Sequence, residues 1–368
     1  MTPVIAGGGP AGAAAACGLA QAGEPVIVLE RSTGPTDKIC GDFLSSETQH
    51  YLNRLGVDPA ALGGHPIGQV RVVRGAQVAQ AALPFRALGL SRRVLDEALL
   101  HHAAACGAEV RRGVTVARLT PEIRFLATGK HDLRVGGRVP LARPDALVGF
   151  KTYFRLAPAQ LEALAGTVEV ILLAGGYAGL QPVEDGRAVL CLLIHRDGLA
   201  RAGGNWPGLL AALRLSSAHV RARLEGAVAL LARPLTIARV PFGYMHLPAA
   251  AESVFRLGDQ ACVIPSFSGD GMAMALHSAA LAVRSYLAGA SPSQYHHQLR
   301  DDVTGPIRRA GLLHEAGRGG RGQALLFHVL RLWPALIGRA ATATRIADAA
   351  LLRDPAGAGC GGAAAARD

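Results

Sequence analysis

Three glycines near the N-terminus have the spacing of a turn that binds a dinucleotide. An apolar run leads into Gly7-x-Gly9-x-x-Gly12, an alanine-rich segment follows, and a second apolar run ends on Glu30. We expect a strand, a tight turn, a helix and a second strand. Gly7 would make the turn and Gly9 would let the backbone approach a pyrophosphate. Gly12 would let helix and strand pack closely, Glu30 would accept a hydrogen bond from a ribose, and the helix N-terminus would offer N–H groups to the phosphates.

The alternative is a glycine-rich turn that binds nothing. The chain contains 46 glycines, so a chance match to the motif is easy. The order of apolar run, glycine turn, helical segment and acidic residue favours the dinucleotide interpretation.

A second glycine-rich region follows more than two hundred residues later. One apolar run ends on Gly258-Asp259, and Gly269-Asp270-Gly271 precedes a segment of helical character over residues 272–287. Glycines at a helix N-terminus again provide a place for a phosphate or for the polarised edge of a ring.

The segments between these motifs predict the elements that position them. Helical patterns cover residues 46–55 and 91–106, and Ser91 is a plausible N-cap of the second helix. Residues 67–88 alternate weakly and predict a hairpin outside the nucleotide domain. Short strands are expected over residues 108–111, 114–119 and 123–126.

The middle of the chain has strand-like runs joined by short turns. This pattern predicts an antiparallel sheet with helices on one side, inserted into the nucleotide domain, and such a sheet could cover a ligand. The expected strands are residues 147–156, 168–174, 177–183 and 188–194, and the expected helices are residues 206–215 and 219–231.

The C-terminal part is largely helical by pattern. One helix is expected over residues 292–317, with a potential break at Gly305-Pro306, and a second over residues 323–333, which Pro334 ends. Residues from 354 onward are rich in Gly and Ala and are expected to be disordered.

The second of these helices carries an apolar face. Leu325, Val329 and Leu332 share it, and Trp333 lies beside it. Core packing, a contact between monomers of a homodimer, or docking to a membrane that holds a lipophilic substrate would each explain such a face.

Composition excludes several classes of protein. Of the 368 residues, 50% are hydrophobic and 18% are charged, with a formal net charge of +11, and no nucleic-acid-binding motif accompanies the basic balance. The six cysteines lack the spacing of a metal site or a disulfide framework, which predicts reduced thiols and no bound metal. No signal peptide precedes the first glycine motif, so we expect a cytoplasmic protein.

With these pieces in order, residues 4–287 resemble the FAD-dependent oxidoreductases built like para-hydroxybenzoate hydroxylase, in particular the branch of geranylgeranyl reductases and flavin-dependent halogenases. The resemblance implies an α/β fold: a Rossmann-type, glutathione reductase-like FAD-binding domain with an inserted antiparallel β-sheet substrate domain and C-terminal helices. It assigns residues 1–66, 89–146 and 250–290 to the FAD-binding domain, 67–88 and 147–249 to the substrate domain, 291–353 to C-terminal helices and 354–368 to a disordered tail.

The same resemblance implies where FAD is held. The first turn would hold the pyrophosphate, the end of the second strand the adenosine ribose, Asp259 the ribityl chain, and the region around Gly269-Asp270-Gly271 the isoalloxazine ring. The implied cofactor-binding residues are Gly7, Gly9, Pro10, Ala11, Gly12, Glu30, Arg31, Lys38, Cys40, Gly41, Arg92, Ala127, Thr128, Gly129, Gly258, Asp259, Pro265, Gly269, Asp270, Gly271 and Met272.

Two departures from the family bear on the reaction. The Asp-Gly pair that aromatic hydroxylases share between FAD and NADPH is missing from the segment that follows Ala127-Thr128-Gly129. NAD(P)H therefore remains a candidate electron donor without a recognisable site. The Trp-x-Trp-x-Ile-Pro motif of halogenases is absent, since the only tryptophans are Trp206 and Trp333, which argues against halogenation.

Three residues are candidates for acting on substrate. Lys151 shares a strand face with Gly149 and Tyr153, so it either lines the ligand pocket or is solvated; His131 could act as an acid or base, and Phe267 could contact the ring. His277 is more simply a packed core histidine.

These observations lead to three functional hypotheses. The first is a monooxygenase of an aromatic or polyketide-like secondary metabolite. The second is a reductase or dehydrogenase of an isoprenoid or other lipophilic substrate, and the third is an FAD-binding protein without activity.

Overall fold

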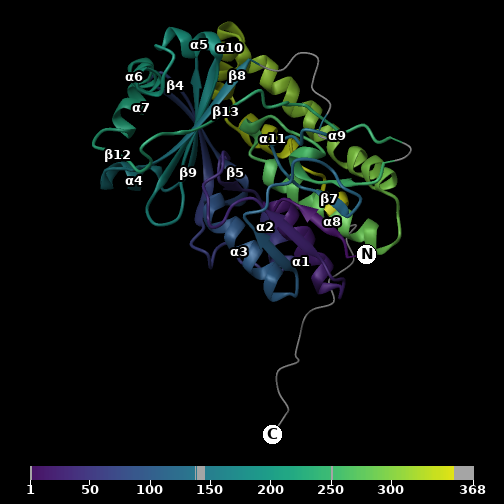
Figure 1. The fold of residues 1–368 in the computed structure, drawn as a ribbon. Coiled ribbons are helices and arrows are strands. Elements are labelled where there is room, and N and C mark those ends of the chain that lie inside the picture. The colour runs from purple at the N-terminus through teal and green to yellow at the C-terminus, as the bar shows by residue number, and fades with distance from the viewer. Residues whose placement is uncertain (1, 137, 139–145, 250–251, 352–368) are drawn as a thin grey trace.

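The computed structural model describes residues 2–136, 138, 146–249 and 252–351, and two sheets organise them (Figure 1). The first is a five-stranded sheet whose neighbouring strands all run parallel. Its strands, in spatial order, are β14 (Phe255–Arg256), β7 (Ile123–Leu126), β1 (Val4–Ala6), β2 (Ile27–Glu30) and β6 (Glu109–Arg112).

Small side chains let helices pack closely on this sheet. Helix α1 (Pro10–Gln21) is alanine-rich and almost entirely buried, and it packs against α3 (Arg92–Ala105) and α8 (Gly271–Leu287). Buried sheet residues such as Ile5, Val28 and Phe125 join the three helices in one core. This is the predicted strand, turn, helix and strand arrangement.

The second sheet has nine strands. Its order is β12 (Val228–Ala229), β8 (Leu147–Arg155), β11 (Ala188–His195), β10 (Gly176–Pro182), β9 (Gly166–Leu173), β4 (His65–Arg74), β5 (Gln77–Gly89) and β3 (Phe43–Leu44), with β13 (Leu235–Ala238) also paired to β8. The β4–β5 hairpin belongs to this sheet, as expected for a segment outside the nucleotide domain. The neighbouring strands of this sheet run antiparallel as predicted, except that β4 runs parallel to β9, which makes the sheet mixed.

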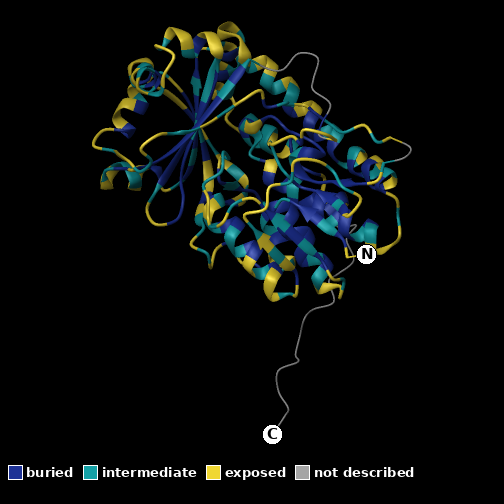
Figure 2. Cartoon of the chain, in the orientation of Figure 1, coloured by how far each residue is buried: buried dark blue, intermediate teal, exposed yellow. Residues whose placement is uncertain are grey.

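Helices cover both faces of the second sheet. On one face, α6 (Trp206–Ser216) and α7 (Ala218–Arg223) bury Leu209, Leu213 and Val220 against alternate sheet residues, with α4 (Pro158–Leu164) and α5 (Arg196–Arg201) beside them. On the other face, α10 (Gly320–Leu332) and α11 (Ala335–Ala343) bury Phe327 and Ile337. Figure 2 shows the strands of this sheet largely buried and the outer helices partly exposed.

The remaining helices connect the two sheets. Helix α2 (Ser46–Arg54) packs on α8, and the long α9 (Pro292–Arg318) packs on both α8 and α10. Helix α12 (Asp348–Leu351) ends the described chain. No single helix of the described residues is long and apolar enough to span a membrane. The segments Gly320–Leu332 and Ala335–Leu351 together have the length and apolar composition of a span, but they are bent by 116° relative to each other.

Three expected elements differ in the structure. Residues 114–119 make only an isolated bridge from Arg118 to Val135. The helix expected over residues 219–231 ends at Arg223 because the chain then turns to pair β12 with β8. Helix α9 continues through Pro306, which is buried in the helix packing with Ile307 and Ala310, so tertiary contacts outweigh the lost hydrogen bond. The tail predicted from residue 354 lies outside the described residues.

Candidate functional site

The first glycine turn has the packing roles that its spacing predicts. Gly7 has φ +107°, a conformation that favours glycine, and a Cβ there would stand 2.4 Å from the carbonyl oxygen of Ala127. A Cβ at Gly12 would stand 1.8 Å from the carbonyl oxygen of Gly7. Neither position can hold a larger residue without moving backbone, so strand and helix meet as closely as a dinucleotide turn requires.

Two helix N-termini without side-chain caps face one cavity. Helix α1 begins after Gly9 and α8 begins after Asp270, and neither N-cap residue makes a side-chain capping bond. Gly9, Ala11, Gly271 and Met272 all line the cavity. The free N–H groups and positive dipole ends of two helices suit an anionic ligand, which fits a pyrophosphate at one end and an electron-rich ring edge at the other.

Glu30 is a buried carboxylate at the end of β2. Its oxygens accept hydrogen bonds from Gly8 N at 2.8 Å and Ser32 N at 2.9 Å, and Lys38 Nζ lies 3.8 Å away. Burial alone would raise the pKa of Glu30, but these donors outweigh it and lower the pKa. An ionised Glu30 therefore lines the cavity where the sequence predicts a ribose.

Arg92 lies over the glycine turn. Its Nε and Nη2 donate to the two carboxylate oxygens of Asp96 at 2.5 and 2.7 Å, and Nη2 would be 3.3 Å from a Cβ on Gly9. Burial would lower the pKa of Arg92, but the charge of Asp96 outweighs burial and raises it. The oriented guanidinium is thus placed at the turn, as the family resemblance implies.

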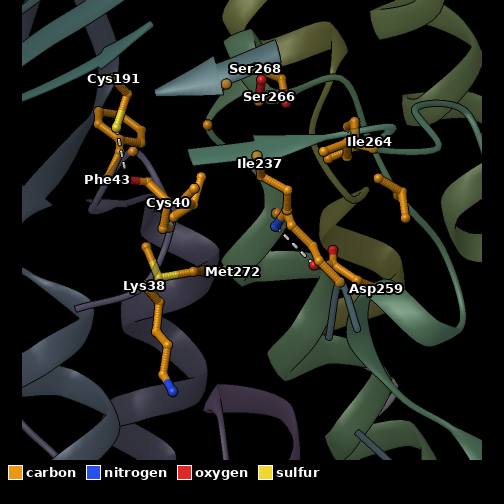
Figure 3. A pocket seen from close by; sticks show the side chains of 18 of the residues that line it. Lys38, Cys40, Phe43, Cys191, Ile237, Asp259, Ile264, Ser266, Ser268 and Met272 are labelled. Atoms are coloured by element: carbon orange, nitrogen blue, oxygen red, sulfur yellow. Dashed lines mark hydrogen bonds and ion pairs between the residues drawn. The ribbon is translucent and has the colours of Figure 1, made fainter. Parts of the chain in front are cut away.

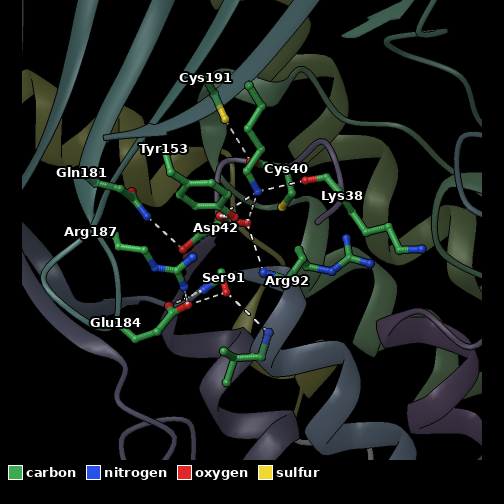
Figure 4. A network of polar contacts seen from close by, with 12 residues as sticks. Lys38, Cys40, Asp42, Ser91, Arg92, Tyr153, Gln181, Glu184, Arg187 and Cys191 are labelled. Carbon is green, nitrogen blue, oxygen red and sulfur yellow. Dashed lines mark hydrogen bonds and ion pairs between the residues drawn. The ribbon is translucent and has the colours of Figure 1, made fainter. Parts of the chain in front are cut away.

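Asp42 anchors the loop that contains Lys38, Cys40 and Gly41, and sequence reasoning missed it. The side chain is fully buried at φ +56°. Lys151 Nζ lies 2.8 Å from Oδ1, and Tyr153 donates to Oδ2 at 2.7 Å (Figure 4). Two features of the sequence could have indicated this contact. Asp42 directly follows Gly41, and strand alternation correctly predicted that Lys151 and Tyr153 share one face.

Further donors hold the same loop. Lys151 Nζ donates to Lys38 O at 2.9 Å, Cys191 Sγ donates to Cys40 O at 2.9 Å, and Gln181 Nε2 donates to Asp42 O at 2.8 Å. All three side chains come from the second sheet, so the sheet fixes the path of the loop beside the cavity.

Lys151 is therefore an anchor and is not placed as an acid or base. Its side chain is fully buried and does not line the cavity. Burial would lower its pKa, but the Asp42 carboxylate outweighs burial and raises the pKa, so the ammonium form persists. The prediction that Lys151 lines the pocket or is solvated was wrong, because Asp42 draws the amine into the junction of the two sheets.

Glu184 makes a second junction that the sequence did not reveal. It lies in the short turn between two expected strands, and its carboxylate accepts hydrogen bonds from Ser91 N at 2.8 Å and Ser91 Oγ at 2.5 Å and pairs with Arg187. Ser91 is also the N-cap of α3, as predicted. The β10–β11 turn is thereby tied to the helix that carries Arg92.

One cavity of about 1780 Å³ connects the two sheets. The dinucleotide turn, the Lys38–Gly41 loop and the Gly269–Gly271 loop line one half. The other half lies between the second sheet and the C-terminal helices and is mostly apolar; its walls include Val70, Val72, Val168, Val170, Leu172, Leu326, Val329, Leu330 and Leu336. Figure 3 shows the junction of the halves, where Cys40, Cys191, Ile237, Ile264 and Met272 surround the space.

The other two catalytic candidates, His131 and Phe267, lie in different halves of the cavity. His131 contacts the Arg31 guanidinium at 2.8 Å, and burial together with that charge lowers its pKa. His131 therefore lies with the expected adenosine end and is not placed to act on substrate. Phe267 lines the cavity near the junction, edge-on to Tyr177 and stacked on His314 with ring centroids 6.3 Å apart.

Two expected cofactor contacts need correction. Pro265 is buried and does not line the cavity. Asp270 is also buried, and its side chain turns toward Thr344 Oγ1 at 3.1 Å and Arg345 Nη1 at 3.3 Å. The carboxylate is bound by these two groups and does not line the cavity, so within residues 269–271 only Gly269 and Gly271 line it.

Gly12 packs against Gly7 and Ala127 and does not line the cavity, whereas the other expected positions do. Asp259 lines it and pairs with Lys130 Nζ at 2.9 Å. Ala127, Thr128 and Gly129 line it after β7, where Gln260 Nε2 donates to Gly129 O at 2.8 Å. His277 is a packed core histidine, as expected, between Tyr51 Oη and Asp302.

Comparisons with known proteins agree with this geometry. Residues 1–133 match the family model of the FAD binding domain. The solved structure of the myxobacterial chondrochloren halogenase CndH is similar to this chain, with a TM-score of 0.68 and 21% sequence identity over 81% of this chain and 77% of the halogenase chain. A flavoprotein/dehydrogenase from Cytophaga hutchinsonii has a TM-score of 0.70 and 17% identity, covering 86% and 88%.

A short stretch of the sequence also matches a protein of a different activity. A menaquinone reductase of Mycobacterium tuberculosis is 46% identical over 54 residues, which are 15% of this chain and only 13% of the relative.

The domain match and the fold together define the class: the chain carries an FAD-binding domain and has the fold of flavin-dependent oxidoreductases. Its cofactor is FAD, as predicted, and the resemblance to the para-hydroxybenzoate hydroxylase-like flavoproteins is confirmed at the level of domain and fold.

Proposed function

We propose that the protein is an FAD-dependent monooxygenase of a lipophilic aromatic or polyketide-like molecule. The observation that carries the proposal is the continuity of the cavity. Its FAD half ends at Gly271 and Met272, and its apolar half begins there, against Ile237, Ile264 and Phe267. A substrate in the apolar half would meet the flavin end of the cofactor directly.

The chemistry divides between cofactor and chain. Bound FAD would supply the redox step, in which one atom of O₂ enters the substrate and the other leaves as water, with two electrons from a donor such as NAD(P)H. The chain binds and orients the reactants, and its apolar walls exclude water. The N–H groups that begin α8 at Gly271 would stabilise negative charge at the ring edge.

A reductase is the second candidate, and one observation favours it specifically. The 54-residue match is to a menaquinone reductase, which supports a reductive reaction. The Lys38-x-Cys40-Gly41 loop, held beside the cavity by Lys151 and Cys191, is the segment that resembles the reductases. In this reaction hydride and a proton would be added to the substrate and O₂ would not be consumed.

Isotope-labelled oxygen separates the two reactions. The FAD-loaded protein is reduced with NADPH or dithionite and then exposed to ¹⁸O₂ with aromatic candidates such as 2-naphthol. A product that gains one ¹⁸O atom supports the monooxygenase. Anaerobic reduction of a quinone such as menadione, with no labelled product in air, would replace it with the reductase. Reduced FAD that reoxidises equally with and without every substrate would indicate a non-catalytic FAD-binding protein.

A further inference from the structure

Helix α10 packs through the face that contains Gln323 and Phe327, and it has an exposed apolar edge as well. Gln323 and Phe327 are buried, and Gln323 Nε2 donates to Leu173 O at 3.1 Å, which fixes the helix to the second sheet. Leu325 is nevertheless 66% exposed and Leu332 is 56% exposed. The apolar face predicted from the sequence is thus divided between the cavity and the solvent.

This exposed edge adjoins the cavity. Val329, which lines the cavity, lies four residues after Leu325 and three before Leu332, so the three side chains are neighbours on the helix surface. Trp333, which follows the helix, is 60% exposed, and Leu312 of α9, also at the cavity rim, is 73% exposed. We call Leu312, Leu325, Leu332 and Trp333 the apolar rim.

The charged residues of α10 and α11 all have one sign, whereas α9 contributes the acidic Glu315, which pairs with Arg318. Between Glu315 and Asp348 the sequence contains no acidic residue but five arginines, Arg318, Arg321, Arg331, Arg339 and Arg345. Arg321 and Arg331 are exposed on α10, and Arg339 is exposed on α11, where it also lines the cavity. A fixed cationic surface attracts an anionic partner.

We propose that the apolar rim and Arg321, Arg331 and Arg339 dock the protein onto an anionic lipid bilayer. Leu and Trp at the edge of a helix with arginines beside them is the pattern of an interfacial helix, which lies in the plane of the membrane surface. The buried face of α10 stays on the sheet, so the helix docks without crossing the membrane. A second copy of the chain fits this surface less well, because a two-fold contact would bring the arginines together.

Docking would also bring the bilayer next to the cavity, which Leu312 and Val329 line. A lipophilic molecule could pass from the bilayer along Leu325 and Val329 into the apolar half without entering water. This entry route rests on the proposed function, whereas docking itself does not, because vesicle binding is measured without turnover.

Vesicle flotation tests the docking surface with the full FAD-loaded chain. We expect binding to phosphatidylcholine vesicles that contain phosphatidylglycerol, weaker binding without it, and loss of binding at high salt. Arg321→Gln with Arg331→Gln should weaken binding about thirtyfold, since each arginine near an anionic surface contributes about 1 kcal/mol. Leu325→Ser with Trp333→Ser should weaken it at least as much.

A matched control and a second readout keep the test decisive. Leu215 is 81% exposed on α6, which packs on the opposite face of the sheet, so Leu215→Ser should bind as the unchanged protein does. In a Trp206→Phe variant Trp333 is the only tryptophan, and its emission should shift to the blue on vesicles and be quenched by brominated lipid.

The FAD content of each purified variant shows whether that variant has folded. Failure of the unchanged protein to bind anionic vesicles, or equal binding of the Leu325→Ser, Trp333→Ser variant with normal FAD content, would overturn the docking proposal. Either result would leave the proposed redox function standing.

Discussion

The two halves of the cavity are built by different physical means. The FAD half is shaped by backbone: glycines at positive φ or in tight contact, and helix N-termini left without side-chain caps. The apolar half is shaped by side chains from β4, β9, α10 and α11, which are far apart in the sequence. Close backbone contacts require glycines at fixed spacings, and these spacings are visible in the sequence. Apolar packing requires no fixed spacing. The sequence therefore predicts the cofactor but not the substrate.

A single methyl group added at Gly12 should abolish FAD binding. In Gly12→Ala the new Cβ would stand 1.8 Å from Gly7 O, so strand and helix must separate and FAD binding should be lost. The purified variant should carry almost no flavin by absorbance and should not take it up. Gly68→Ala is the control, because a Cβ there would meet nothing within 4 Å. A Gly12→Ala protein with stoichiometric FAD would refute the backbone account.

The junction of the halves should be the next most sensitive place. Lys151→Met leaves the Asp42 carboxylate buried without its cation, which should lower the free energy of unfolding by about 3–5 kcal/mol, measured by urea denaturation. Adding Asp42→Asn should restore part of the loss because the uncompensated charge is removed. If the single variant lost less than about 1 kcal/mol, the ion pair would not hold the junction.

A second buried ion cluster should respond to pH. Asp270 lies with Arg345 and Glu47, and burial raises the pKa of Asp270 to about 7, above the unfolded value of about 3.9. Between these values the unfolded state has released the proton that the folded state retains, so this group reduces stability as pH rises from about 4 to about 7.

Asp270→Asn removes this titration. Its stability relative to the unchanged protein should therefore increase across that pH range, by on the order of 1–4 kcal/mol. Urea midpoints of both proteins at pH 5 and pH 8 measure the difference. A difference that does not change with pH would show that Asp270 is already ionised at the lower pH.

The smallest effect is expected at the hydrogen bond between Tyr177 and Ser266. The two hydroxyl oxygens lie 2.5 Å apart and connect β10 to the segment before α8. Tyr177→Phe and Ser266→Ala should each cost about 0.5–1.5 kcal/mol, and the double variant should cost little more than one of them. Fully additive losses would mean that the hydroxyls do not interact.

The sequence was informative wherever local rules decide the structure. It predicted the turn at Gly7 and Gly12, the cap at Ser91 and the four strands from β8 to β11. It did not predict the contact of Asp42 with Lys151, because residues more than a hundred positions apart meet only through the packing of two sheets. It also misplaced Asp270, since nothing near Gly269 and Gly271 indicates that Arg345 and Thr344 will bind the carboxylate.

The central claim is that FAD and an apolar ligand lie side by side in one cavity. Titrating the oxidised, FAD-loaded protein anaerobically with 2-naphthol measures this directly through the flavin absorbance spectrum. We predict a saturable perturbation that Gly179→Leu abolishes while FAD is retained, because Gly179 lines the cavity with open space at its Cβ. No perturbation by any apolar ligand, or an equal perturbation in Gly179→Leu, would contradict the account.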